Sequence, residues 1–539
     1  MVAMNTAQST DQEGAHGGGA VNRIDEVTIV GGGTAGWLTA MVLNTTLNIR
    51  RSGPPVRITL IESPNVPTIG VGEATVPGMP NLLRQLRIDE SAFFKATNAS
   101  FKLGVRFVDW QLDDAGRPTS YIHPFNSAPA VGGYLPAYHY HRFGRPEGCE
   151  DLADAVAPNS SVIKGYFGPR PIGGKEYEGL IGYAYHLDAA LFAKFLRSIA
   201  LERGVRHVVD DVVDVRLAEN GFVSALHLKD GGLMPVQFVV DCTGFRGLII
   251  QKALGEPFES YGDQLLCDSA LAVQLPHQDP EHLEPCTRST ALGAGWCWRV
   301  PLYTRVGTGY VFSSRFRSDD AAMDEFMEYL GDHGKGAEPR VIRMRVGRTR
   351  NAWVKNCAAI GLSGGFIEPL ESTAIYMIEM AARWLSHYFP NREVSPALAE
   401  AFNGHMRNLT EEVRDFIVTH YYTSNRPDPF WVAARSEIEL SDRLRARLEL
   451  WRHTLPGSTD TAGDKLFSFW NYLYVLYCKG YFKEASFPLA GSVDQGDWQD
   501  YTRRLNDTKA DLRRQLPNHY ALLTSIRERA DEAAVPLRE

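Results

Sequence analysis

The chain has 539 residues, 44% of them hydrophobic and 22% charged, which is ordinary for a globular protein large enough to hold more than one core. Its formal net charge of −8 argues against nucleic acid as a partner, because nucleic-acid-binding proteins usually carry a basic surface. No apolar run approaches the roughly 18 residues of a membrane span. The seven cysteines are scattered without a Cys-x-x-Cys pair, so we expect a reduced, cytoplasmic protein without a metal site.

The N-terminal segment, residues 1–22, is polar and rich in glycine. It lacks the basic start and the apolar stretch of a signal peptide. We therefore expect a disordered tail, with the ordered chain beginning at about residue 23.

The stretch "EVTIVGGGTAGWLTAMVLN" at 26–44 is typical of a short buried strand, a glycine turn and a helix. Gly31, Gly33 and Gly36 follow the spacing G-x-G-x-x-G, and a second strand over 56–63 ends at Glu62. The glycines let the backbone approach a pyrophosphate at the helix N-terminus, and the carboxylate can accept a ribose hydroxyl. This order of elements predicts dinucleotide binding; the alternative is a turn that serves only tight packing.

Only one such fingerprint is visible in the chain. A protein that reduces its own flavin with NAD(P)H often carries a second one. We therefore expect reduction by a separate partner, although some flavin hydroxylases bind NADPH without a second fingerprint.

Further sheet segments follow at wide intervals. We predict a helix and then a strand over 186–216, with Val208–Val215 as the strand. A hairpin followed by a buried strand is predicted over 221–244, and another strand over 356–366 runs into glycines. These strands are far apart in the sequence, and we expect them to converge on one nucleotide. This pattern indicates a flavin-binding α/β domain with an insert. From about residue 376 the pattern is helical, interrupted by prolines.

Three more stretches contain residues suited to chemistry. "TIGVGEATVPGMPNLLRQL" at 68–86 places glycines and an acid just after the second strand, and "NASFKLGVRFVDW" at 98–110 places a lysine among apolar side chains. "GFIEPLESTAIYMIEMA" at 365–381 is a loop that runs into a helix. The N–H groups at such a helix start favour a small anion.

Together these stretches resemble the flavin-dependent tryptophan halogenase family over roughly 24–485. The resemblance rests on the glycine fingerprint, Gly-Glu-Ala-Thr at 72–75, Phe101-Lys102, Trp296-x-Trp298-x-Val300-Pro301 and Glu-Pro-Leu-Glu-Ser-Thr at 368–373. It implies an α/β (α+β) fold with a Rossmann-type FAD-binding domain of the flavin monooxygenase kind. The implied division is an FAD-binding core over 23–375, with inserted substrate-facing segments, and a mostly helical region over 376–539 that completes the substrate pocket.

The resemblance also implies a cofactor and partners. FAD is expected as FADH2, supplied by a separate NADH-dependent flavin reductase, with chloride or bromide as co-substrate. A homodimer is an open alternative to a monomer. The residues expected to bind the cofactor are Gly31, Gly33, Thr34, Ala35, Gly36, Glu62, Gly72, Glu73, Ala74, Thr75 and Gly361.

Lys102 and Glu371 match the catalytic pair of the family. In these enzymes a halide is oxidised beside the flavin to hypohalous acid, which reaches the lysine through a tunnel. The lysine either hydrogen-bonds the hypohalous acid or becomes a haloamine, and the glutamate can remove the ring proton. The alternatives are an exposed lysine at 102 and, for one of Glu368 and Glu371, a charge favoured only by a helix start. Ser372 could orient Lys102 or the substrate.

Trp296 and Trp298 are expected to stand between flavin and substrate and to suppress hydroxylation, with packing on a strand as the alternative. Thr373 and Ala374 match the halide-binding pair of the family. The family commonly has glycine at the second position, and alanine would disfavour a positive φ there. The sequence therefore does not determine the geometry or the halide preference of this site.

The substrate is expected to be tryptophan, a tryptophan within a peptide, or another indole. Aromatic side chains over 420–431 and 466–482 could sandwich its ring, Phe469 and Trp470 among them, or could pack only as helix core. In family members that act on free tryptophan, a polar and tandem-tyrosine run follows the Phe-Trp pair and helps to hold the charged end of the amino acid. This run is only partly kept here, which favours an altered binding site for that charged end. The alternatives to halogenation are hydroxylation on the same fold and FAD binding without catalysis.

Overall fold

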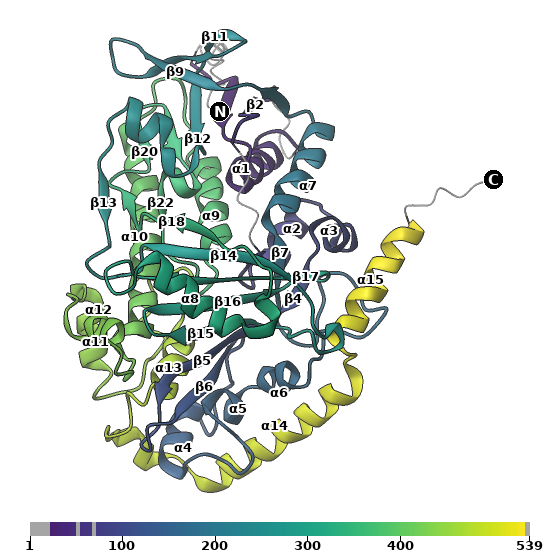
Figure 1. Ribbon diagram of the computed structural model, residues 1–539, viewed down its shortest axis with the longest axis vertical. Coiled ribbons are helices and arrows are strands. Elements are labelled where there is room, and N and C mark those ends of the chain that lie inside the picture. Colours follow the sequence, from purple (N-terminus) through teal and green to yellow (C-terminus); the bar gives the residue numbers. More distant parts are fainter. Residues whose placement is uncertain (1–21, 50–53, 67–71, 534–539) are drawn as a thin grey trace, which may run out of the picture.

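The computed structural model describes residues 22–49, 54–66 and 72–533, so the predicted tail lies almost wholly outside the described residues (Figure 1). Its nucleotide-binding half is built on a six-stranded sheet. The strands pair in the order β20 (Trp353–Val354), β21 (Cys357–Ala359), β12 (Phe238–Asp241), β1 (Glu26–Val30), β2 (Arg57–Glu62) and β8 (Arg206–Val209). The pairs from β21 to β8 are parallel, and the two central strands of the sheet, β12 and β1, have buried apolar side chains.

The helix predicted after the glycine turn is α1 (Thr34–Asn44). It packs between α7 (Ala189–Glu202) and α9 (Ala374–His387), as Figure 1 shows. The βαβ unit and the convergence of distant strands on one sheet are therefore confirmed. This is the arrangement of a Rossmann-type nucleotide-binding domain.

The strand predicted over 208–215 is instead two strands in different sheets. β8 ends at Val209 and pairs with β2, whereas β9 (Val212–Leu217) joins the hairpin of β10 (Val223–Leu228) and β11 (Gly232–Pro235). The cause is Asp210, whose carboxylate accepts the backbone N–H groups of Asp211, Asp230 and Gly231. At this break between the strands, the carboxylate of Asp210 accepts the backbone hydrogen bonds that a neighbouring strand would otherwise accept.

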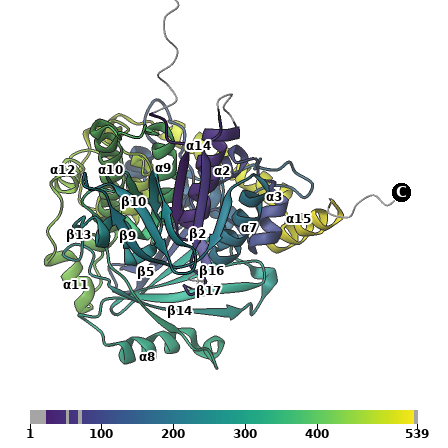
Figure 2. The same cartoon turned by 90° about the horizontal axis from the view of Figure 1, so that it is seen from above.

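The second half is built on a seven-stranded sheet that the sequence did not reveal. Its order is β18 (Arg340–Arg343), β14 (Ser269–Pro276), β17 (Arg305–Phe312), β16 (Gly295–Pro301), β15 (Thr287–Leu292), β5 (Gly104–Leu112) and β6 (Pro118–Pro124). Its pairs are antiparallel except β15 with β5. Helix α8 (Asp319–Leu330) covers its outer face, as the view from above shows (Figure 2).

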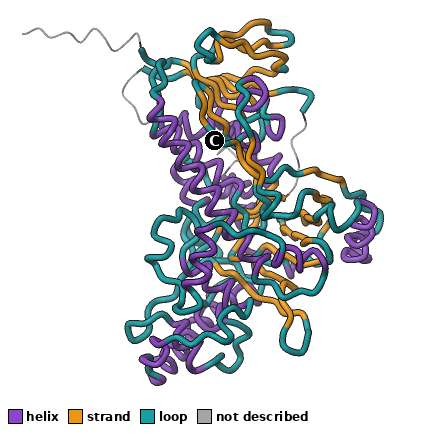
Figure 3. The backbone as a smooth tube through the Cα atoms, turned by 90° about the vertical axis from the view of Figure 1, so that its left-hand side faces the viewer, coloured by secondary structure: helices purple, strands orange, loops and turns teal. Residues whose placement is uncertain are grey.

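The chain is helical from α9 onwards, as predicted. The later helices are α10 (Pro396–Tyr422), α11 (Pro429–Ser436), α12 (Asp442–Leu450), α13 (Phe469–Cys478), α14 (Gln495–Gln515) and α15 (His519–Ala533). Figure 3 shows helices gathered along one flank of the sheets. None of the helices within the described ranges is long and apolar enough to cross a membrane.

A three-stranded sheet joins the two halves. It consists of β3 (Gly72–Ala74), β7 (Ala184–Asp188) and β4 (Ser100–Lys102). Each of the two large hydrophobic cores contains residues from before and after position 375. One core includes Ile29 and Leu522, and the other includes Phe107 and Tyr472. The division into two regions at that position stays a prediction.

Candidate active site

The glycine turn after β1 opens on a cavity of about 540 Å³. Strand ends of the nucleotide-binding sheet, β3 and the start of α9 form its wall. Of the residues expected to bind the cofactor, those that line this cavity are Gly31, Gly33, Thr34, Ala35, Glu62, Gly72, Glu73, Ala74 and Gly361.

The turn itself requires glycine. Gly31 has φ +123°, and a Cβ there would lie 2.2 Å from the carbonyl oxygen of Cys242. A Cβ on Gly36 would lie 1.9 Å from the carbonyl oxygen of Gly31, whereas the space beside Gly33 is open. The turn is thus packed tightly on its inner side and free on the side where a pyrophosphate would approach the start of α1.

The acid at the end of β2 also lines this cavity. Glu62 Oε2 lies 2.9 Å from Nε2 of His207, and a quarter of the side chain is exposed, so the carboxylate is accessible to a ribose hydroxyl. Burial raises the pKa of Glu73, which also lines the cavity, to about 7. These residues fit a dinucleotide such as FAD. Among the described residues, no group of three or more His, Cys, Asp or Glu side chains is arranged to hold a metal ion.

Lys102 is fully buried at the end of β4 and is not an exposed lysine. Its Nζ donates to the carbonyl oxygen of Thr75 at 3.0 Å and to Oγ of Ser372 at 2.7 Å, and it lies 5.0 Å from the ring centre of Phe125. Thr75 therefore contacts the lysine rather than the nucleotide cavity. Burial lowers the pKa of Lys102 from 10.5 to about 7, although the negative charge of Glu371 opposes the shift.

Ser372 is the point where the nucleotide cavity meets the lysine. It lines the cavity, and its Oγ accepts the bond from Lys102. Its φ is +63°, a left-handed conformation that costs a residue with a side chain on the order of 1 kcal/mol. A strained backbone at this place directs one short side chain toward Lys102 while leaving room for the cavity.

Glu371 is buried between two histidines. His123 Nδ1 and His420 Nε2 each lie 2.9 Å from its Oε1. Burial raises the pKa of Glu371, but the contacts with His123 and His420 outweigh burial and hold this pKa at about 2, so the group is a carboxylate at neutral pH. Burial lowers the pKa of His420 to about 4, which makes that ring a neutral partner.

The other acid of the motif has a different environment. Glu368 is fully buried, accepts a short hydrogen bond from the Tyr421 hydroxyl, and burial raises its pKa to about 7. Neither acid lies in the first turn of α9, which begins at Ala374. Both are buried by tertiary packing, so the alternative of a charge favoured only by a helix start does not apply.

Trp296 and Trp298 lie two residues apart on β16, and both line the nucleotide cavity. Their ring centres are 6.4 Å apart at an angle of 63°. Trp296 is buried against Trp110, whereas Trp298 is partly exposed and packs on Gly309, where a Cβ would lie 2.2 Å from its ring. The pair therefore combines packing with a position at the cavity wall.

The start of α9 resolves the concern about alanine at 374. Thr373 is the N-cap and Ala374 the first helical residue, and the positive φ is at Ser372, two residues before Ala374. Alanine therefore fits without strain. Ala374 lines the cavity, and the first N–H groups of a helix have no partner within it.

The aromatic segment of α13 is largely buried. Trp470 is buried against Tyr474, with ring centres 5.7 Å apart, and Phe469 is half-buried beside it. Tyr472 is fully buried against Phe416. Asn471 Nδ2 lies 2.9 Å from Nε2 of His123, which links α13 to Glu371.

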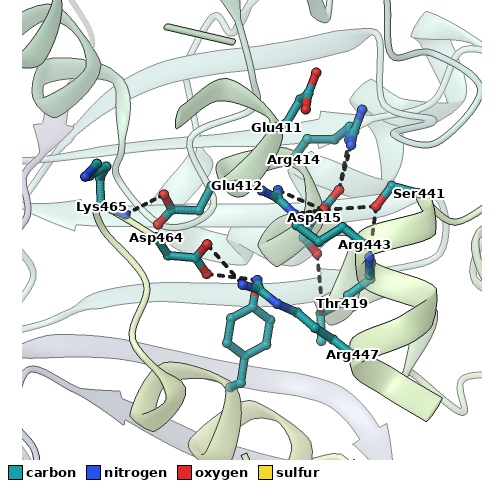
Figure 4. A network of polar contacts seen from close by, with 12 residues as sticks. Glu411, Glu412, Arg414, Asp415, Thr419, Ser441, Arg443, Arg447, Asp464 and Lys465 are labelled. Carbon is teal, nitrogen blue, oxygen red and sulfur yellow. Dashed lines mark hydrogen bonds and ion pairs between the residues drawn. The ribbon is translucent and has the colours of Figure 1, made fainter. Parts of the chain in front are cut away.

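A polar network fixes the loop before α13 (Figure 4). Glu412 accepts the backbone N–H groups of Lys465, Leu466 and Phe467, each at 2.7 Å. Arg447 donates to both carboxylate oxygens of Asp464. The loop that leads into Phe469 is therefore anchored to α10 and α12.

Sequence reasoning missed His123, His420 and Asn471. The first is in β6, the second near the end of α10 and the third in α13, with 348 positions between His123 and Asn471. No local pattern marks them, because their association depends on how three separate elements pack.

Comparison with known proteins gives one family. The family model described as tryptophan halogenase matches residues 26–495. Tryptophan 6-halogenase ThaL of Streptomyces albogriseolus is 38% identical over 451 residues, which cover 81% of this chain and 83% of that protein.

Solved structures agree in fold. The crystal structure of tryptophan 6-halogenase SttH from Streptomyces toxytricini superposes with a TM-score of 0.87 at 36% identity, covering 93% of this chain and all of the other. MibH, described as a lathipeptide tryptophan 5-halogenase, superposes with a TM-score of 0.80 at 30% identity, with 95% of both chains covered.

Proposed function

Because the chain belongs to the tryptophan halogenase family, a family of flavin-dependent enzymes, we propose that it halogenates an indole ring held beside Lys102 and Glu371. FAD is the cofactor, used as FADH2, and a halide is the co-substrate. In this family a separate flavin reductase supplies the reduced flavin. The observation that carries the residue assignment is Ser372, which lines the nucleotide cavity and bonds Lys102.

The bound flavin supplies, with oxygen, the oxidising power that converts halide into an electrophilic halogen. Lys102 receives that halogen. Since its pKa is about 7, a large fraction of the side chain is a neutral amine at the pH of the cell. A neutral amine attacks hypohalous acid, forms a nitrogen–halogen bond and releases water. The hydrogen bonds to Thr75 and Ser372 hold the amine in place for this step.

Glu371 completes the reaction on the ring. When a ring carbon takes the halogen, the nitrogen keeps the electron pair of the nitrogen–halogen bond and takes up one proton, which regenerates the amine. The ring becomes a cation that must lose a proton. Glu371 is a carboxylate near the lysine, with a pKa of about 2, and it stabilises that cation and accepts the proton. Trp296 and Trp298 separate the ring from the flavin, and Thr373 with Ala374 forms the halide site.

For the substrate we propose an indole whose amino-acid charges are absent, such as tryptophan within a peptide. The polar groups that follow Trp470 bond within the protein: Asn471 to His123, the Tyr472 hydroxyl 3.5 Å from Arg447, and the Tyr474 hydroxyl to the Asn126 carbonyl oxygen. These groups are thus not free to clamp a carboxylate or an ammonium. Similarity to a lathipeptide tryptophan halogenase supports the same direction.

The test compares free tryptophan with N-acetyl-tryptophan amide, which has the same ring without either charge. The purified enzyme is supplied with FAD, a flavin reductase, NADH and either chloride or bromide. We expect kcat/KM for the amide, and for a tryptophan-containing peptide, to equal or exceed that for free tryptophan. Efficient turnover of the free amino acid alone would refute the substrate class while leaving the chemistry intact.

A further inference from the structure

The side-chain amide of Asn471 has a fixed orientation. The backbone N–H of Ser468 donates to Asn471 Oδ1 at 2.7 Å, and the Ser468 hydroxyl lies 3.1 Å from the same oxygen. This is one half of a capping box at the start of α13. Because the oxygen faces Ser468, the nitrogen of the amide must face the other way.

That nitrogen faces His123. Asn471 Nδ2 lies 2.9 Å from His123 Nε2. An amide NH2 group can only donate, so Nε2 must accept, and a proton on Nε2 would set two donors against each other. The proton of the neutral ring is therefore on Nδ1, which lies 2.9 Å from Glu371 Oε1 and donates to it.

We propose that Asn471 is a positioning residue that keeps His123 as a neutral ring donating from Nδ1 to Glu371. This inference rests on the proposed function, because it assigns Asn471 to the carboxylate that accepts the ring proton. A neutral donor orients Glu371 without cancelling its charge, whereas an imidazolium in the same place would form an ion pair and weaken the carboxylate as a base.

The position of Asn471 is held from several sides. Glu412 and Arg447 anchor the loop before it, through the network in Figure 4. Phe416 stacks on Phe467 with ring centres 4.0 Å apart and lies 5.8 Å from the ring of His123. The donor is therefore presented to Nε2 by a rigid support rather than by a mobile side chain.

Other charged and titratable groups lie near this cluster. His420 contacts Glu371 Oε1, and its Nδ1 lies 3.3 Å from the Tyr121 hydroxyl. Lys102 bonds Ser372, and Lys479 lies 5.9 Å from the ring centre of Tyr121. The Nε2 side of His123 faces Asn471, so Asn471 determines which nitrogen of the ring has the proton.

The decisive variant is Asn471→Asp, which replaces one NH2 group with an oxygen. An acid at the third position of a helix is favoured by the capping box and by the helix dipole, so α13 is expected to form as before. The new carboxylate only accepts, and it therefore draws a second proton onto His123. We expect kcat to fall on the order of 10-fold or more, less than the 10²–10⁴-fold expected when a catalytic base is removed.

Asn471→Gln is the matched control. Glutamine keeps the donor and is itself a good capping-box residue, so it should retain most of the activity. Asn471→Glu has the length of glutamine without the donor and should behave like Asn471→Asp. A purely structural role would make glutamine and glutamate equally harmful.

A second measurement does not depend on turnover. Nitrogen chemical shifts of 15N-histidine-labelled enzyme, with the His123 signals assigned by their loss in His123→Gln, should show protonated Nδ1 and unprotonated Nε2. In Asn471→Asp both nitrogens should be protonated at the same pH. A wild-type enzyme with the proton on Nε2, or Asn471→Asp with wild-type shifts and kcat, would overturn the proposal. Loss of the proposed function would appear separately, as Glu371→Gln with full activity.

Discussion

Lys102 Nζ lies 2.7 Å from Ser372 Oγ, across the wall that separates the nucleotide cavity from the buried lysine. The two residues are 270 positions apart in the chain. One comes from a strand of the small sheet and the other from the strained loop before α9. This bond is the most direct link between the cofactor site and the group proposed to receive the halogen.

Removing the hydroxyl tests that link. We expect Ser372→Ala to lower kcat about tenfold, the equivalent of one buried hydrogen bond to an ionisable group. Ser372→Gly should lose the same activity but be more stable than Ser372→Ala, by on the order of 1 kcal/mol, because glycine adopts φ +63° without strain. Steady-state kinetics measure kcat, and thermal unfolding measures the stability, of the two variants. Equal stability of the two variants would contradict the strain.

The pH profile of kcat tests the state of Lys102. Burial lowers the pKa of Lys102 to about 7, and the neutral amine is the form proposed to take up the halogen. We therefore expect kcat to rise as pH increases through about 7 and then to level off. A fall of kcat over the same interval would show that the charged ammonium is the active form.

Lys102 should also reduce the stability of the fold. The pKa of Lys102 is about 7 in the folded chain and 10.5 in the unfolded chain, so the unfolded chain binds more protons between these values and stability rises with pH there. We expect Lys102→Met to raise the free energy of unfolding by about 1–3 kcal/mol at pH 7. The gain should shrink as pH approaches 10.5, as unfolding experiments at several pH values would measure. A gain that did not change with pH would rule out burial of an ionisable group as its cause.

The two acids of the motif should respond differently to substitution. Glu371 is a carboxylate with a pKa of about 2, so Glu371→Gln should lower kcat about 10²–10⁴-fold. Burial raises the pKa of Glu368 to about 7, so a large fraction is protonated near neutrality and glutamine resembles that form. We expect Glu368→Gln to change kcat only a few-fold. Equal losses from both variants, measured in parallel, would remove the distinction between their roles.

The parts of the site that could be predicted from sequence are those with a local signature. The glycine fingerprint, Lys102 in its apolar stretch and the acids at 368 and 371 each stand in a short motif. The structure brings Lys102 and Glu371 near one another, because Lys102 Nζ donates to Oγ of Ser372, the residue after Glu371.

What could not be predicted depends on contacts between distant segments. His123 and Asn471 come from a strand and a helix, and no pattern in either element indicates the other. The geometry left open at Ala374 has a local answer, because the left-handed residue is Ser372. The strand break at Asp210 depends on a carboxylate that accepts three backbone N–H groups, a choice that hydrophobic patterning does not show.

Mass spectrometry of the product tests the account most directly. Wild-type enzyme and Lys102→Met are each given FAD, a flavin reductase, NADH, halide and the uncharged tryptophan amide, with flavin binding checked for both. The account predicts a product with the isotope pattern of chlorine or bromine from the wild type and none from Lys102→Met. A hydroxylated product from the wild type, or equal halogenation by the variant, would contradict it.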